Sequence, residues 1–212
     1  MNDTTERQII KLRETLLDLI ANTAPPAGIP TGVSSTTVRI LNEITGKVET
    51  AKEKSGLMAL NQLDGIVAKA KEDASGRVIK ALYGVRQHLR WSQNENYKKH
   101  KHMNGYLNNS AFCEFVGPRG IYKTNEVAIG FFLMGPHIHY PNHNHPAAEV
   151  YFVLSGNAQW ACGTEDWKLQ PPGSSIYHSP NLNHAMRTTD DPLLALFCWH
   201  GDLQTYPNPT LN

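Results

Sequence analysis

The sequence predicts a mainly β protein in which an antiparallel β-barrel follows a helical N-terminal part. Three observations predict this fold class. Before about residue 100, apolar residues recur near the period of a helix. After about residue 105, short apolar or alternating runs are separated by Gly, Pro and Asn, and no helical stretch lies between them. Strands with this spacing are typical of a sandwich or barrel. We therefore expect a helical extension over residues 1–100, packed on a β-barrel over residues 101–212.

Four helices are expected in the N-terminal part, and a segment rich in proline and glycine interrupts them. Residues 22–32 contain three prolines and two glycines, which forbid a continuous helix. This segment is either a lid over the barrel mouth or a plain connector. The second helix can find N-cap oxygens in residues 34–37, and the fourth can find one in Asp73 or Ser75. The expected helices cover residues 9–20, 34–44, 57–71 and 78–89, and the expected strands cover residues 127–134, 149–156, 158–163, 174–179 and 193–199.

Composition and charge argue against several classes of protein. A formal net charge of +1 with 18% charged residues gives no electrostatic basis for binding nucleic acid or an anionic membrane. No apolar run approaches the roughly 20 residues that span a bilayer, and the first ten residues lack a signal-peptide pattern. Cys113, Cys162 and Cys198 have no CxxC spacing, which favours reduced thiols. We expect a cytoplasmic protein that binds neither nucleic acid nor membrane.

Histidines are concentrated in the β-rich half, where seven of the ten lie between residues 137 and 200. The densest stretch reads His143-x-His145-x3-Glu149-x-Tyr151. In a strand, side chains two residues apart point the same way, so these four side chains share a face if the stretch is extended. Pro146 indicates an edge or a bend within it. The opposite face falls to Val150, Phe152 and Leu154.

Two imidazoles and one carboxylate suit a borderline divalent ion such as Zn, Fe, Mn, Co or Ni. A fourth ligand should come from a strand distant in sequence, and residues 171–187 offer His178 and His184. We favour His184, because it follows a turn whose end can present it toward the barrel mouth. His137 and His139 are expected at the rim, facing solvent. The predicted site is one divalent transition-metal ion held by His143, His145, Glu149 and His184.

These residues resemble a known pattern, that of the cupin superfamily. The two stretches that carry the resemblance are Gly135-x7-His143-x-His145-x3-Glu149-x6-Gly156 and Pro172-Gly173-x10-His184. The opening glycine stands two residues further from the first histidine than in the superfamily pattern, and the usual asparagine after the last histidine is absent. The resemblance implies a jelly-roll barrel that holds a metal ion on three histidines and a glutamate, here the four ligands named above.

A narrower resemblance is to the bacterial dimethylsulfoniopropionate (DMSP) lyases of the cupin type. It rests on "YPNHNHPAAEVYFVLSGNAQW", on "YHSPNLNHAMRT" downstream, and on the helical character of the N-terminal part. That family cleaves DMSP to dimethyl sulfide and acrylate. The resemblance therefore implies a metal-dependent carbon–sulfur lyase with a small-molecule substrate.

Such an elimination needs a base near the substrate α-carbon and a surface that accepts a sulfonium cation. Tyr140 and Tyr151 are the candidate bases, since a nearby divalent cation favours the phenolate form. We lean toward Tyr140 as the base and Tyr151 as a partner on the metal side. Trp199 and Tyr122 are the candidate aromatic contacts for the substrate.

Two other readings remain open from the sequence alone. The same ligands can serve another metal-dependent cupin enzyme, a dioxygenase or an isomerase, in which a tyrosine base is unnecessary. The barrel can also bind a small ligand without catalysis and report to a partner through the helical half. An exposed helix face could support a homodimer.

Overall fold

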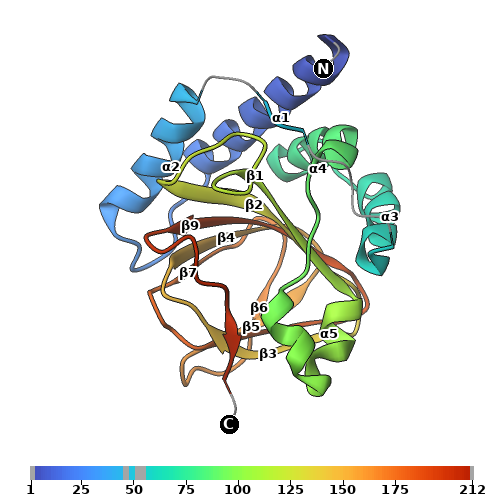
Figure 1. The fold of residues 1–212 in the computed structure, drawn as a ribbon, viewed down its shortest axis with the longest axis vertical. Helices are drawn as coiled ribbons and strands as arrows, with labels where there is room; N and C mark the ends of the chain where they lie inside the picture. The colour runs from blue at the N-terminus through green and yellow to red at the C-terminus, as the bar shows by residue number, and fades with distance from the viewer. Residues whose placement is uncertain (1–2, 45–47, 51–55, 211–212) are drawn as a thin grey trace.

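The computed structural model describes residues 3–44, 48–50 and 56–210, and its fold is mainly β with helices at the N-terminus, as predicted (Figure 1). Parts of the predicted ranges 1–100 and 101–212, namely residues 1–2, 45–47, 51–55 and 211–212, lie outside the described residues. Two five-stranded antiparallel sheets face each other, which confirms the predicted antiparallel β-barrel.

Several pairs of consecutive strands are divided between the two sheets. Strands β3 (His139–Asn144) and β4 (Ala148–Ser155) lie in different sheets, and so do β7 (Ser175–His178) and β8 (His184–Thr188). The connections therefore cross from one wall of the barrel to the other. In spatial order, the first sheet contains β1 (Ser110–Val116), β2 (Val127–Met134), β9 (Leu193–His200), β4 (Ala148–Ser155) and β7 (Ser175–His178). The second sheet contains β10 (Asn208–Pro209), β3 (His139–Asn144), β8 (His184–Thr188), β5 (Ala158–Cys162) and β6 (Lys168–Gln170).

The first sheet is buried on both faces, and its side chains alternate between two cores. Tyr151 and Val153 of β4 pack in the barrel interior. Val150, Phe152 and Leu154 face the other way and pack with the helices in a second core, as their parity predicted. Figure 1 shows helices α1 to α4 gathered over this outer face, so the helical half shields one wall of the barrel.

The helices follow the predicted order, but their ends differ from the prediction. The second helix begins at Thr31, after Pro30, and not within residues 34–37. Ser35 and Thr37 donate their hydroxyls to carbonyls one turn earlier, so they lie inside the helix and do not cap it. Asp73 does cap α4, because its carboxylate accepts the backbone N–H of Gly76 at 2.8 Å. The α-helices are α1 (Asp3–Asn22), α2 (Thr31–Glu43), α3 (Gln62–Ala68), α4 (Ala74–Val85) and α5 (Asn104–Asn108).

The predicted helix over residues 57–71 is shorter than expected. Residues Met58–Asn61 form a 3-10 turn, η1, ahead of α3. Further 3-10 turns are η2 (Arg86–His88), η3 (Glu95–Lys99) and η4 (Lys101–Met103). Residues 23–30 connect α1 to α2, while Asn22 ends α1 and Thr31 and Gly32 begin α2. The connection touches β7, where Ser175 donates its hydroxyl to the carbonyl of Ala24. None of residues 22–32 lines the aromatic pocket described below.

The structure can be compared with the expectations about membrane spans and cysteines. None of the helices in the described residues is long and apolar enough to cross a membrane. Cys113, Cys162 and Cys198 are free thiols, as predicted, and Cys113 and Cys198 are buried.

Candidate metal centre and its pocket

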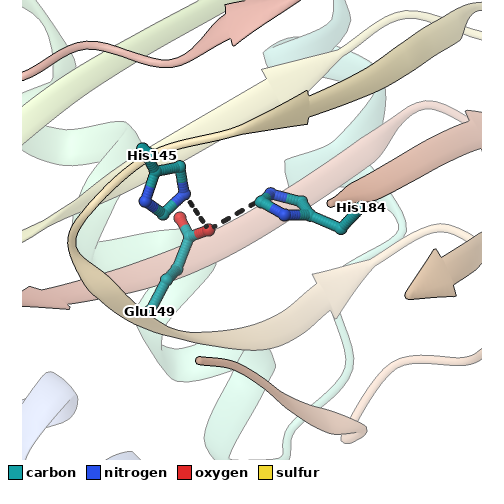
Figure 2. A group of neighbouring side chains, drawn as sticks. All are labelled: His145, Glu149 and His184. Atoms are coloured by element: carbon teal, nitrogen blue, oxygen red, sulfur yellow. Dashed lines mark hydrogen bonds and ion pairs between the residues drawn. The ribbon is translucent and has the colours of Figure 1, made fainter. Parts of the chain in front are cut away.

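Three predicted ligands meet inside the barrel: His145, Glu149 and His184 (Figure 2). Their donor atoms all lie within 4.8 Å of one another, and all three side chains are buried. The Nε2 atoms of His145 and His184 lie 3.0 Å and 3.6 Å from Oε2 of Glu149. Both rings point toward the same carboxylate oxygen, which is the arrangement of a small cation site.

The fold brings these side chains together from opposite walls of the barrel. Glu149 belongs to β4 in the first sheet, whereas His143 and His184 are directly paired across β3 and β8 in the second. His145 lies in the short bend with Pro146 between β3 and β4. The expected single extended face is therefore wrong in detail. The side chains converge because the chain crosses between sheets at Pro146, and not because they alternate along one strand.

His143 lies beside this group without being one of its three members. Its ring centroid is 4.0 Å from that of His184, and its ring stacks on Tyr140 at 3.7 Å. His143 is thus next to the cluster, at the wall formed by β3 and β8. His137 and His139 are exposed, as predicted.

Backbone carbonyls orient three of the histidine rings in the same way. Nδ1 of His143, His145 and His184 each lies 2.8–3.0 Å from a carbonyl two residues away in the chain. A carbonyl can only accept, so each Nδ1 carries a hydrogen, and a neutral ring held in this way keeps its lone pair on Nε2. In metalloproteins the same kind of contact fixes the tautomer of a histidine ligand.

The protonation states of these histidines and of Glu149 suit the binding of a cation. Burial lowers the pKa of His143 to about 3 and holds the pKa of His184 well below its ordinary value, so these imidazoles are neutral. Burial acts to raise the pKa of Glu149, but the charges and hydrogen bonds of His145 and His178 outweigh it and hold the pKa well below its ordinary value. The carboxylate is therefore ionised.

The donor set therefore passes a test of fit for a divalent metal. The Nε2 lone pair of the neutral His184 ring faces a carboxylate oxygen that also carries lone pairs, an arrangement that a cation between them relieves. Nε2 of His184 is buried and has no hydrogen-bond partner among the described residues. Two imidazoles and a carboxylate are ligands that Zn, Fe, Mn, Co and Ni accept.

An aromatic pocket lies beside this group. Glu149 belongs to the group and also lines the pocket. The pocket also contains both predicted catalytic tyrosines and the predicted aromatic contact Trp199. Its aromatic lining comprises Tyr106, Phe112, Phe132, Tyr140, Tyr151, Phe197, Trp199 and Tyr206. The barrel therefore offers an apolar, π-rich space next to one potential metal ligand.

The two tyrosines are held differently within this pocket. The hydroxyl of Tyr140 lies 2.9 Å from that of Tyr97, and its ring is sandwiched between His143 and Tyr106. Tyr151 packs edge-on to His178. Burial raises the pKa of both Tyr140 and Tyr151 well above its ordinary value, so both are neutral phenols in this state.

Trp199 lines the pocket, whereas Tyr122 does not. The Trp199 indole stacks on the ring of His145 at 4.3 Å. Tyr122 is buried in the other core, between the first sheet and the helices, where it packs edge-on to Phe115. Its position on the outer side of the sheet separates it from the pocket, so it does not fit the predicted role of a substrate contact.

Sequence reasoning missed three features of this region. His178 was named as a candidate ligand but not chosen, and it contacts a member of the group, with Nδ1 3.3 Å from Oε2 of Glu149. Tyr97, which contacts Tyr140, precedes a basic run and gave no signal. The buried carboxylate of Glu114 lines the pocket with Arg119. A glutamate inside the apolar run "AFCEFV", five residues before an arginine, was a signal that could have revealed this pair.

Comparison with known proteins shows which family the chain resembles. The model of the dimethylsulfoniopropionate lyase family matches residues 34–195. The chain is 35% identical over 98 residues to dimethylsulfoniopropionate lyase DddQ of Ruegeria pomeroyi, a match that covers 46% of this chain and 48% of that protein. It is 30% identical over 131 residues to a putative dimethylsulfoniopropionate lyase, DddL, of Cereibacter sphaeroides, covering 61% and 53%. The chain spans about half the length of the curated relatives it matches.

Two solved structures share the fold over nearly the whole chain. One is described as the DMSP lyases RdDddP and RnDddQII, with a TM-score of 0.73, 23% identity and coverage of 98% of this chain and 100% of that one. The other is DMSP lyase DddQ from Ruegeria pomeroyi DSS-3, with a TM-score of 0.72, 22% identity and coverage of 99% and 98%. The family match at residues 34–195 includes His145, Glu149 and His184. The chain therefore belongs to the dimethylsulfoniopropionate lyase family.

Proposed function

We propose that this chain is a metal-dependent lyase that cleaves DMSP by β-elimination to dimethyl sulfide and acrylate. One observation carries the proposal: Glu149 belongs to the His145–Glu149–His184 group and also lines the aromatic pocket that holds Tyr140 and Tyr151. Membership of the family supports the choice of substrate.

The proposed cofactor is one divalent transition-metal ion, of the set Zn, Fe, Mn, Co and Ni. His145, Glu149 and His184 would hold it, with His143 as the further predicted ligand. When bound, such an ion supplies a Lewis acid for the negative charge that develops as the α-proton leaves. The carbonyl contacts that fix the rings of His143, His145 and His184 support this assignment.

A tyrosine is the proposed general base, with Tyr140 preferred and Tyr151 as its partner on the metal side. The phenolate oxygen takes the proton from the substrate α-carbon. The electron pair of that C–H bond forms the double bond of acrylate, while the bond from the β-carbon to sulfur breaks and its electrons leave on neutral dimethyl sulfide. Because burial keeps both phenols neutral, a cation beside them is required to favour the phenolate.

The aromatic lining is the proposed recognition surface for the sulfonium end of the substrate. Aromatic faces attract cations by about 0.5–2 kcal/mol each. Trp199 is the preferred contact, since it lines the pocket next to Glu149. For the chain as a whole, we propose a helical extension over residues 1–100 on a barrel over residues 101–212, which the packing of α2 on β2 and of α4 on β4 supports.

The test is headspace gas chromatography for dimethyl sulfide. Purified protein is treated with a chelator, each of Mn, Fe, Co, Ni or Zn is added back, and DMSP is supplied, with His145→Ala as the matched variant. We expect release that depends on the metal and is lost in His145→Ala. Release no faster than the alkaline background with every metal would refute the lyase proposal.

A further inference from the structure

His178 is a fourth buried residue, and its side chain faces the His145–Glu149–His184 group. It lies at the end of β7, directly opposite Glu149 of β4 in the ladder, and it is fully buried. Side chains opposite each other in an antiparallel pair project to the same face. The ladder therefore places the His178 imidazole against the Glu149 carboxylate without any help from a loop.

Three imidazole nitrogens surround one oxygen of Glu149. Oε2 lies 3.0 Å from Nε2 of His145, 3.3 Å from Nδ1 of His178 and 3.6 Å from Nε2 of His184. The other oxygen, Oε1, accepts the indole N–H of Trp199. The carboxylate is thus oriented so that a single oxygen faces the three histidines.

His178 differs from the other histidines in what holds its ring. The rings of His143, His145 and His184 each contact a backbone carbonyl through Nδ1. In His178, Nδ1 itself faces the cluster, and its Nε2 is buried with no hydrogen-bond partner among the described residues. The ring also stacks on His184, with centroids 3.9 Å apart.

We propose that His178 is a protein ligand of the metal ion, through Nδ1, in addition to His145, Glu149 and His184. This inference rests on the metal site of the proposed function but not on the lyase reaction. It adds a histidine from β7 to the donors from β4, β8 and the bend at Pro146, and to the further predicted ligand His143 of β3. The alternative role is a hydrogen-bond donor that merely positions Glu149.

An asparagine at this position separates the two roles. In His178→Asn, the side-chain amide can still donate a hydrogen bond to Glu149, as Nδ1–H would, but a neutral amide is a poor ligand for a transition metal. X-ray absorption at the metal edge of the Zn²⁺-loaded protein counts the imidazoles bound to the ion. We expect that count to fall by one in His178→Asn, with the affinity for Zn²⁺, measured by chelator competition, weakened by about tenfold or more.

The matched control is His139→Asn, because His139 is exposed and outside the cluster; it should change neither the count nor the affinity. A crystal structure of the Zn²⁺-loaded wild-type protein tests the same point without a variant, with Nδ1 of His178 expected at about 2.0–2.1 Å from the ion. An unchanged imidazole count in His178→Asn, or a His178 ring that stays away from the ion, would overturn this inference alone. Wild-type protein that binds no metal would overturn the proposed metal site together with it.

Discussion

Trp199 donates its indole N–H to Oε1 of Glu149 at 2.5 Å. The two residues are directly paired across β9 and β4, so the sheet itself fixes the contact. A charge-assisted hydrogen bond of this kind holds the Glu149 carboxylate and leaves its other oxygen to face His145 and His184. Trp199 was predicted only as an aromatic contact for the substrate. In the structure it lines the pocket and also orients Glu149.

Trp199→Phe separates these two functions of the tryptophan. Phenylalanine keeps an aromatic ring over His145 but removes the N–H that Glu149 accepts. We expect metal affinity to fall by about tenfold, in the range typical of lost outer-shell partners, as measured by chelator competition. Trp160→Phe is the matched control, because Trp160 is buried in the same barrel and its N–H has no partner among the described residues. Equal affinities in the two variants would contradict the orienting role.

Tyr140→Phe and Tyr151→Phe identify the base. Loss of a general base typically costs about 10²–10⁴-fold in rate, so we expect kcat for dimethyl sulfide release to fall in that range for Tyr140→Phe. The expected fall is smaller for Tyr151→Phe. The measurement is the initial rate with saturating metal and DMSP.

Tyr97→Phe is the control for Tyr140, because it removes the hydroxyl that contacts Tyr140 while leaving the proposed base in place. A larger loss for Tyr151→Phe than for Tyr140→Phe would reverse the assignment. Near wild-type rates for both would remove tyrosine from the role of base.

The sequence predicted four of the five strands of the first sheet, all but β1 (Ser110–Val116), because this sheet has a strong local signal. Strand β2 reads "VAIGFFLM" and β9 reads "LLALFCWH", and such continuous apolar runs mark strands buried on both faces. Strand β3 was missed because it reads "HYPNHN", which is polar and contains a proline. Its place in the barrel depends on pairing with β8, a long-range contact that no local pattern specifies.

The candidate site likewise depends partly on local sequence patterns and partly on long-range strand pairing. The spacing around His145 and Glu149 pointed to ligands, because both residues lie within a few positions of one bend. Choosing between His178 and His184 needed the register of β4 with β7 and of β3 with β8, and both histidines approach Oε2 of Glu149, at 3.3 Å and 3.6 Å. Tyr122 was assigned from its aromatic character alone, and the face of the sheet on which it lies decided against it.

The histidine at the end of β9 predicts how stability depends on pH. Nε2 of His200 lies 2.9 Å from the hydroxyl of Thr37 in α2, and burial lowers its pKa to about 4. The unfolded chain takes up this proton near pH 6.5, whereas the folded chain does so only near pH 4. The contribution of His200 to the free energy of unfolding is therefore fully present above about pH 6.5 and is lost as the pH falls toward 4.

His200→Gln removes this titration while keeping a polar group near Thr37. We expect the wild-type protein to lose more stability than His200→Gln between pH 7 and pH 5, measured by urea unfolding at each pH. Other buried histidines, such as His143, titrate in both proteins, so the difference between the two curves reports His200. Parallel curves over this range would show that His200 is not a source of the acid sensitivity.

Glu114 and Arg119 form a buried ion pair on the wall of the pocket. Glu114 accepts the Nε–H of Arg119 at 2.7 Å and its backbone N–H at 2.8 Å. Arg119 also donates to the carbonyl of Leu203 and lies over the ring of Tyr206 at 4.7 Å. The Glu114 side chain is only 2% exposed and that of Arg119 is 28% exposed, so removing the arginine leaves a buried carboxylate without its cation.

Arg119→Met should therefore lower the free energy of unfolding by about 3 kcal/mol, the lower end of the range for breaking a buried pair, because Arg119 is partly exposed. Adding Glu114→Gln removes the stranded charge, so the double variant should be more stable than Arg119→Met alone. Arg39→Met is the control, since its pairs with Glu43 and Glu126 are exposed and such pairs contribute about 0–1 kcal/mol. Urea unfolding measures all of these proteins. If Arg119→Met costs no more than Arg39→Met, solvent already reaches Glu114 and this wall of the pocket is wet, which would weaken the case for a dry, aromatic site around the sulfonium.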